Sequence, residues 1–333
     1  MVAQNGNPKY IPPFSALPLS PSHPRHSAWG LWGPSDELGT LNLLTSPLVA
    51  LAARENIITG HRISLNWSLN TPRGSSCPPF FARAAFHHEV YMKAPPRVVC
   101  DDIWSFNSQC SSQWDGLRHF GYQKERLFYN GTTEQEIVGE GAGDKLGIHN
   151  IAEKGIVGRG VLLDFHRWRK ETGGSPGYNP FATGSITLGQ LKEVAAFQGT
   201  EFRQGDILLI RSGWFAAFEE LDEEKKRSYA LREGPPQLSG LEQSEEMLEF
   251  LWDNHFAAAG GDAPSFECYP PQKDYFLHEV LLGGWGMPIG ELFHLEALSK
   301  HCEETKRYAF FVTSEPCNVT GGVASPPNIL SIF

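Results

Sequence analysis

Hydrophobic and polar residues in the first third of the chain follow the periods of regular secondary structure. One segment, SPLVALAAREN (46–56), has a helical pattern, with Ser46 expected as N-cap and Pro47 at the first helical position. Three further segments are rich in β-branched and aromatic residues and are predicted as strands. These are HRISLNWSL (61–69), HHEVYMKAP (87–95) and RVVCDDIWSF (97–106).

The rest of the chain alternates between apolar runs and amphipathic segments. The apolar runs predict strands and are GRGVLLDF (158–165), GDILLIRSGWF (205–215), FAAAGGDAPSF (256–266) and RYAFFVTSEP (307–316). The amphipathic segments predict helices and are TLGQLKEVAAFQG (187–199), SEEMLEFLWDNH (244–255) and HLEALSKHCEETK (294–306). Thr187 is expected to cap its helix, with Gly199 near the end. Because strands outnumber helices, the predicted class is mixed α/β with a large β share.

The domain organisation predicted from these patterns is an arm followed by one body. Residues 1–27 are rich in proline and have no period, so they are expected to form an extended arm that wraps the body or a neighbouring subunit. Residues 28–333 are expected to form a single domain, because 41% of the 333 residues are hydrophobic. The loop at 169–185 is too short to separate two domains.

Charge and composition exclude several classes of protein. The net charge is −10 and the chain has no basic stripe, which excludes a nucleic-acid binder. No secretory signal is seen, and no stretch approaches the ~20 apolar residues of a membrane span. The six cysteines show no CxxC spacing, so we expect reduced thiols in a cytoplasmic protein.

Three local patterns resemble functional motifs but are better explained as ordinary structure. Residues 173–177 match G-x-S-x-G, but no apolar strand precedes them and no helix can follow Pro176. The glycines at 139–143 lack the spacing of a phosphate loop. His87 and His88 are adjacent on a predicted strand and face opposite sides, so at most one can serve a site.

Three segments place ionisable residues beside glycines and apolar runs, at 107–122, 260–267 and 278–291. If these segments converge, they bring together Asp115, His119, His278 and Glu291. Two imidazoles and two carboxylates can bind a divalent cation and leave one base free for chemistry. The alternative is that each histidine is a structural residue.

The segment QCSSQWDGLRH (109–119) resembles the motif H-x-G-T-H-x-D-x-P-x-H of the cyclase family, which includes bacterial kynurenine formamidase and isatin hydrolase. Asp115 and His119 match its aspartate and last histidine, whereas Gln109 and Gln113 replace its first two histidines. His278 and Glu291 match a later His and Glu pair of the family. The form Ser-Gln-Trp-Asp-Gly-Leu-x-His resembles a branch common in fungi and some bacteria. Other segments typical of that branch are DELGTLNLL (36–44), GIVGRGVLLD (155–164) and GGVASPPN (321–328).

The resemblance implies a swivelling β/β/α fold, usually in homodimers or homotetramers. It implies that Asp115, His278 and Glu291 are metal ligands and that His119, supported by Asp115, is the general base. Gln109 and Gln113 occupy the remaining ligand positions. A glutamine can ligate only through its neutral amide oxygen, so Mn²⁺ is favoured over Zn²⁺. The alternative is a metal-free site in which the glutamines donate hydrogen bonds to a substrate carbonyl.

The function that the resemblance implies is metal-assisted hydrolysis of a C–N bond, in an amide or cyclic amide, as in kynurenine formamidase. The first alternative is a cyclase or dehydratase of a secondary-metabolite pathway, with or without a metal. The second is a catalytically silent binding protein. The substrate would be a small molecule, and four aromatic residues are candidates to line its pocket, namely Trp104, Trp114, Phe120 and Trp285.

Overall fold

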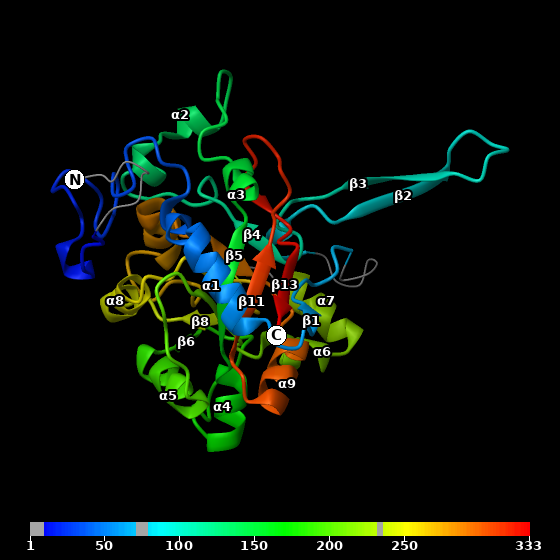
Figure 1. Cartoon of the computed structure of the whole chain (residues 1–333). Coiled ribbons are helices and arrows are strands. Elements are labelled where there is room, and N and C mark those ends of the chain that lie inside the picture. Colours follow the sequence, from blue (N-terminus) through cyan, green and yellow to red (C-terminus); the bar gives the residue numbers. More distant parts are fainter. Residues whose placement is uncertain (1–9, 71–78, 232–235) are drawn as a thin grey trace.

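A mixed sheet forms the centre of the computed structural model, which describes residues 10–70, 79–231 and 236–333 (Figure 1). Within those residues the sheet has nine strands in the order β1-β13-β11-β5-β7-β9-β10-β4-β12. Their bounds are β1 Arg62–Ser64, β4 Gln113–Asp115, β5 Ile156–Leu163, β7 Ile207–Ile210, β9 Ala258–Gly261, β10 Ile289–Glu291, β11 Ala309–Ser314, β12 Ala324–Ser325 and β13 Ile329–Ile332. The predicted class, mixed α/β with a large β share, is confirmed.

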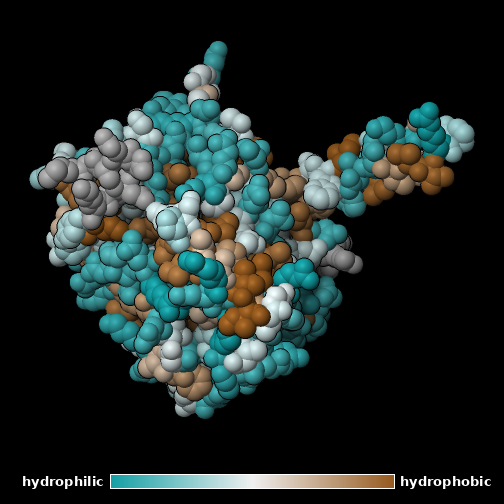
Figure 2. Space-filling model, in the orientation of Figure 1, coloured by the Kyte–Doolittle hydropathy of each residue, from teal (hydrophilic) through white to brown (hydrophobic). Residues whose placement is uncertain are grey.

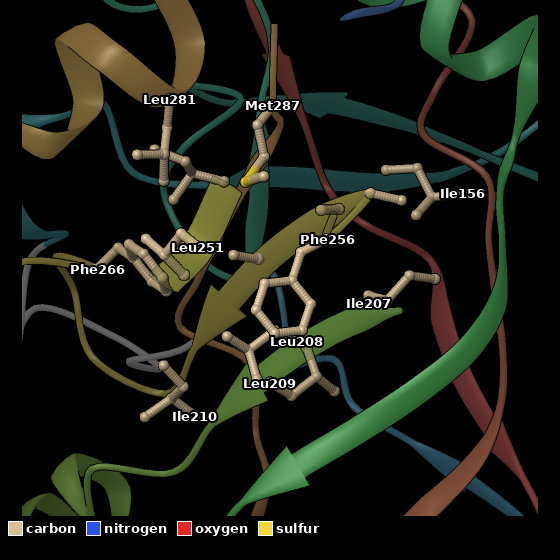
Figure 3. Close-up of a cluster of buried hydrophobic side chains, with 14 of the residues drawn as sticks. Ile156, Ile207, Leu208, Leu209, Ile210, Leu251, Phe256, Phe266, Leu281 and Met287 are labelled. Carbon is tan, nitrogen blue, oxygen red and sulfur yellow. The ribbon is translucent and has the colours of Figure 1, made fainter. Parts of the chain in front are cut away.

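Parallel strands occupy the middle of the sheet and antiparallel strands its two sides. β5, β7, β9 and β10 are parallel neighbours, whereas β11 and β4 each pair antiparallel with a strand of this central set. β7 is an uninterrupted apolar run whose four residues are all buried, as expected of a parallel strand covered on both faces. Figure 3 shows the side chains of β7 in the same buried cluster as Phe256, Leu251 and Met287.

The helices lie around this sheet. α1 contacts β5 and β11, and α5 contacts α4 and β5. A short π-helix, Glu279–Trp285, precedes β10 and is fully buried. The bounds of the α-helices are α1 Ser46–Asn56, α2 Glu134–Ile137, α3 Ile148–Lys154, α4 Phe165–Thr172, α5 Leu188–Gln198, α6 Trp214–Glu219, α7 Glu223–Leu231, α8 Glu245–Asp253 and α9 Glu296–Thr305. A two-stranded parallel sheet joins β6 Gly184–Ile186 to β8 Ser239–Leu241.

The helix ends show how far local sequence decides structure. Thr187 caps α5 in a reciprocal box with Gln190, and Gly199 ends the helix in the left-handed conformation, as predicted. The helix at 46–56 is also confirmed, but its N-cap residue is Thr45, so the assignment of Ser46 was wrong by one position. The strand predicted at 61–69 is shorter than expected, because only Arg62–Ser64 pairs with β13.

Two strands leave the body of the molecule as a hairpin, which Figure 1 shows extending away from the sheet. They are β2 His87–Met92 and β3 Cys100–Ser105, paired antiparallel. Their side chains are exposed or, at Asp101, partly exposed. The exposed residues include large hydrophobic ones, which appear as brown patches among the teal ones of the hairpin in Figure 2.

The described part of the N-terminal arm, from residue 10 onward, lies against the body of its own chain. The Trp252 indole donates to the Pro12 carbonyl (2.8 Å). The Phe14 amide donates to Asp253 (2.8 Å), and the Trp285 indole to the His26 carbonyl (2.8 Å). The boundary at residue 27 stays a prediction.

The described chain offers no helix that combines the length and apolarity needed to cross a membrane. Five cysteines in the described residues are free thiols, three of them buried. Cys77 lies outside the described residues.

Candidate functional site

Two neighbouring strands near one side of the sheet carry polar side chains into a buried position. β4 and β10 pair antiparallel, so that Gln113 lies opposite Glu291 and Asp115 opposite Ile289. Because side chains alternate along a strand, Gln113 and Asp115 share one face and Trp114 points to the other. Asp115 is 0% exposed and Glu291 4%. The carboxylates therefore meet within the protein, away from bulk water.

His278 is oriented toward these carboxylates by a third acid, Glu267. The Nδ1 atom of His278 lies 2.6 Å from Glu267 Oε1, and the backbone amide of His278 donates to the same oxygen (2.9 Å). Gln243 donates to the other oxygen of Glu267 (2.7 Å). The Nε2 atom of His278 then faces Glu291 Oε1 at 3.4 Å and Asp115 Oδ2 at 4.0 Å.

Asp115 has one satisfied and one unsatisfied oxygen. Oδ1 accepts from the amide nitrogens of Gln109 (2.7 Å) and Gln113 (3.3 Å). Oδ2 is buried and has no hydrogen-bond partner within the described part of the chain. One ligand atom each from Asp115, His278 and Glu291 lie within 4.8 Å of one another. A buried carboxylate oxygen without a partner is costly, and a cation among these three atoms would remove that cost.

Arg83 determines the orientation of the Gln113 side-chain amide. Its Nη1 donates to the side-chain oxygen of Gln113 (3.4 Å) and to the backbone oxygen of Gln109 (3.0 Å). Since a guanidinium has no acceptor, the Gln113 oxygen faces Arg83 and its nitrogen faces Glu291 Oε2 at 2.9 Å. Both glutamines thus present amide nitrogens to the carboxylates. The role of Gln109 and Gln113 as metal ligands stays a prediction.

His119 lies at the solvent side of this cluster. Its side chain is 22% exposed, against 9% for the side chain of His278, and its Nε2 is 3.9 Å from Asp115 Oδ2. The Gln109 amide nitrogen lies 3.3 Å from the His119 ring nitrogens. The ring of Phe120 lies beside both His119 and His278. Of the cluster, His119 is the residue placed to meet a small molecule that arrives from solvent.

The pKa values of the two histidines move in opposite directions. Burial lowers the pKa of His119 below its ordinary value, although Asp115 partly opposes this effect. Burial also disfavours the charged form of His278, but hydrogen bonds to Glu267 and Glu291 outweigh it and raise the pKa of His278 to about 10. Burial, aided by the charge of Glu291, raises the pKa of Asp115. His119 is therefore the neutral imidazole of the pair at neutral pH, as a general base requires.

The structure brings together six predicted site residues, namely Gln109, Gln113, Asp115, His119, His278 and Glu291. Of the predicted pocket aromatics, only Phe120 lies beside them. Trp114 is 0% exposed and packs on Phe293, and Trp285 is 0% exposed and packs on Trp252. Trp104 is 57% exposed on the projecting hairpin. These three tryptophans do not line the site, because two serve the core and one points to solvent.

Sequence reasoning missed the residues that orient the cluster, which are Arg83, Gln243 and Glu267. Glu267 ends the segment 260–267 that was singled out, so its position was a usable signal. Arg83 and Gln243 lie in segments without any recognisable motif. Phe276 was also missed, and its ring packs on Phe120.

The chain belongs to the cyclase family. The family model described as “Putative cyclase” matches residues 22–268. The crystal structure of a novel cyclase is 31% identical, with a TM-score of 0.79, and the match covers 92% of this chain and 99% of the other. The specific branch suggested by the motif stays a prediction.

More distant structures share the fold. Isatin hydrolase A from Ralstonia solanacearum is 16% identical with a TM-score of 0.56, and the match covers 86% of this chain and 96% of the other. Isatin hydrolase A from Labrenzia aggregata, bound to benzyl benzoate, is 16% identical with a TM-score of 0.55, covering 88% and 98%. A search of curated protein sequences found no match. The fold is thus that of the cyclase family, a single mixed α/β domain with a large curled sheet.

Proposed function

We propose that the protein is a metal-assisted hydrolase of a C–N bond in an amide or cyclic amide. The observation that carries the proposal is the unpartnered Oδ2 of Asp115, buried beside His278 Nε2 and Glu291 Oε1. Two carboxylates and one imidazole suit an oxygen-preferring ion, which favours Mn²⁺ over Zn²⁺. His278 would release its Nε2 proton to bind a divalent ion together with Asp115 and Glu291. Such an ion would polarise a substrate carbonyl and lower the pKa of a bound water.

The surrounding residues hold these three groups in position. Glu267 engages Nδ1 of His278, which directs Nε2 toward Asp115 and Glu291. The two glutamine amides bind one oxygen of each carboxylate and leave the other oxygen facing His278. Such partners orient metal ligands and fix which atom points inward. The family's histidines at 109 and 113 are therefore replaced here by residues that support the carboxylates.

His119 is the proposed general base. It is the most exposed member of the cluster, and burial keeps its pKa below the ordinary value, so it is neutral at pH 7. A neutral imidazole can take a proton from an attacking water and return it to the leaving nitrogen. Asp115, at 3.9 Å, stabilises the imidazolium that forms between these two transfers.

The substrates to test first come from the relatives. The fold is shared with proteins named isatin hydrolase, and the resemblance of residues 109–119 extends to kynurenine formamidase. We propose a small carbonyl compound with an amide or cyclic amide, with N-formylkynurenine and isatin as the first candidates. The proposed site of action is the cytoplasm.

The proposal is tested by purifying the protein without added metal, measuring its bound metals, and assaying the panel with Mn²⁺, Zn²⁺ or chelator. We expect about one divalent ion per chain and activity that chelator removes and Mn²⁺ restores. Asp115→Asn should lose the ion while keeping its fold, as judged by circular dichroism. Hydrolysis that persists fully in chelator would contradict the metal-assisted reaction.

A metal-free cyclase or dehydratase is the second candidate, and the glutamine amides favour it. Their nitrogens and the protonated ring of His278 already compensate much of the carboxylate charge without an ion. In that case His119 would move protons on a polyketide or related precursor. Turnover of such a precursor in chelator, lost in His119→Ala, would favour this reading over hydrolysis.

A further inference from the structure

An apolar cavity of about 510 Å³ lies next to the candidate site and shares a residue with it. Its described lining comes from the segment before β2 and from the segment around the end of α7, and it includes Phe80, Phe81, Tyr229, Leu231 and Leu238. Arg83 is the one charged side chain of that described lining. A concave apolar site with a single polar group is typical of small-molecule binding.

Arg83 lies between this cavity and the acidic cluster. Its guanidinium is 5.1 Å from the Phe81 ring centroid, on the cavity side. On the cluster side, its Nη1 contacts Gln109 and Gln113. Gln109 in turn contacts His119 at 3.3 Å. Gln109 is thus in contact with both Arg83 and His119, so one ligand that extends past Gln109 can reach both side chains.

The guanidinium of Arg83 forms no direct ion pair, because Gln109 and Gln113 lie between it and the carboxylates of the cluster. Among residues 10–70, 79–231 and 236–333, no carboxylate lies within the 4.0 Å of an ion pair with it. Arg159, which is partly buried like Arg83, and the buried Arg211 each pair with a carboxylate, at 2.7 and 2.9 Å. The contacts of Arg83 to protein oxygens in those residues use Nη1 alone, so Nη2 and Nε keep donors for a ligand. A planar fork of donors fits a carboxylate.

We propose that Arg83 and this cavity form a subsite for an amphipathic carboxylate, in which Arg83 binds the carboxylate and the apolar part of the molecule fills the cavity. The subsite rests on the proposed function for its role, because it selects acidic substrates for the reaction at His119. Arg83 is then a specificity-determining residue. A neutral substrate of the same shape would leave the guanidinium without its partner and bind less tightly.

The test uses binding rather than turnover. 4-Phenylbutyrate and its neutral isostere 4-phenylbutyramide are titrated by calorimetry into the full chain carrying His119→Ala, in chelator, so that neither reaction nor metal ligation contributes. We expect the acid to bind roughly tenfold or more tightly than the amide. Arg83→Gln should abolish this preference and Arg83→Lys should keep part of it. The exposed Arg126, which pairs with Glu134, provides the control Arg126→Gln, in which the preference stays.

A second variant tests the cavity itself. Ala230→Trp places a large ring in the lining and should weaken acid and amide alike, leaving their ratio unchanged. Equal binding of acid and amide to the parent protein, or a preference that survives Arg83→Gln, would overturn the subsite. If Arg83→Gln does not fold, the ratio of acid to amide affinity, measured in the parent protein and in Ala230→Trp, still tests the subsite. If the parent protein hydrolyses no amide but still binds the acid more tightly than the amide, only the proposed function is contradicted.

Discussion

Two pairs of short strands, β4–β10 and β2–β3, invert the usual relation between polarity and burial. β4 and β10 carry Gln113, Asp115 and Glu291 into positions that are at most 4% exposed. β2 and β3 instead hold large apolar side chains in solvent, with Val90 60% and Trp104 57% exposed. Both pairs are antiparallel, but only the sequences of β2 and β3 predict strands, since β4 (QWD) and β10 (IGE) are too short and too polar to show a strand pattern.

The comparison shows that antiparallel pairing alone does not determine which side chains of a strand are exposed to water. Burying carboxylates costs free energy unless each is bonded to a partner, so the β4–β10 cluster needs a compensating role, which we assign to the reaction. A two-stranded ribbon is marginal in water by itself, so we expect a further surface to cover the β2–β3 hairpin. We therefore assign the buried polar residues of β4 and β10 to a reaction, and we expect the exposed apolar residues of β2 and β3 to form an interface.

Removing the imidazole of His119 is the most damaging change that we predict for the β4–β10 region. His119→Ala should lower kcat about 10²–10⁴-fold, because the proton transfers lose their base. Circular dichroism and metal content should stay unchanged, since the side chain lies at the solvent side of the cluster. The matched control is His61→Ala, at an exposed histidine outside the site. Equal kcat values in the two variants would show that His119 is not the general base.

Gln113 provides a test of the support given to the carboxylates. Gln113→Leu leaves Glu291 Oε2 without its donor, so we expect the free energy of unfolding to fall by about 1–3 kcal/mol. Gln204→Leu, at an exposed position, should change it by less than about 0.5 kcal/mol. Denaturant titrations of both variants give the comparison. Similar values for the two would mean that the amide contributes little to the cluster.

Histidine at positions 109 and 113 tests whether side chains at these two positions of the β4–β10 region can reach a metal ion. The double variant Gln109→His and Gln113→His returns the family's residues, and its Zn²⁺ affinity should rise at least about tenfold if these positions can reach the ion. Competition titration with a chromophoric chelator measures the change. Unchanged affinity would show that the alignment of these positions with family ligands does not hold in space.

The raised pKa of His278 predicts that the stability of the folded protein falls as the pH rises. The folded protein keeps the proton on His278 up to about pH 10, against an ordinary value of 6.5. The resulting stabilisation is fully present below pH 6.5 and is lost as the pH rises toward 10. In chelator, the difference in Tm between the parent protein and His278→Gln should therefore be largest near pH 6 and smallest near pH 10. A difference that grows with pH would contradict this assignment.

The hairpin is where we expect the smallest effect on stability and the largest on assembly. We propose that it contacts a second copy of the chain, in keeping with the homodimers and homotetramers that the family resemblance implies. Replacing Val90, Val98 and Trp104 by serine should leave the Tm of the monomer fold nearly unchanged. Sedimentation velocity should show a smaller assembly than for the parent protein. The same mass for both would exclude the hairpin from the interface.

The sequence was most informative where local patterns decide structure. The helices at 187–199 and 244–255 and the buried strand at β7 follow from caps and apolar periods that need no distant partner. Asp115, His119, His278 and Glu291 were identified because their motif spacing marks them, and the structure brings them together.

The remaining features depend on contacts between distant segments. The orientation of Gln113 is set by Arg83, thirty residues earlier, and that of His278 by Glu267. Trp114 and Trp285 looked like pocket residues, but the alternation along β4 and the packing against Trp252 direct them into the core. No pattern within one segment specifies these pairings, because they depend on the register of the sheet.

Anomalous X-ray diffraction at the manganese edge, from crystals grown with Mn²⁺, tests most directly whether the β4–β10 cluster holds an ion. We predict one strong peak among Asp115, His278 and Glu291 in the parent protein, and none in Asp115→Asn. A cluster without a peak in the parent protein, at Mn²⁺ concentrations that support full activity, would contradict it.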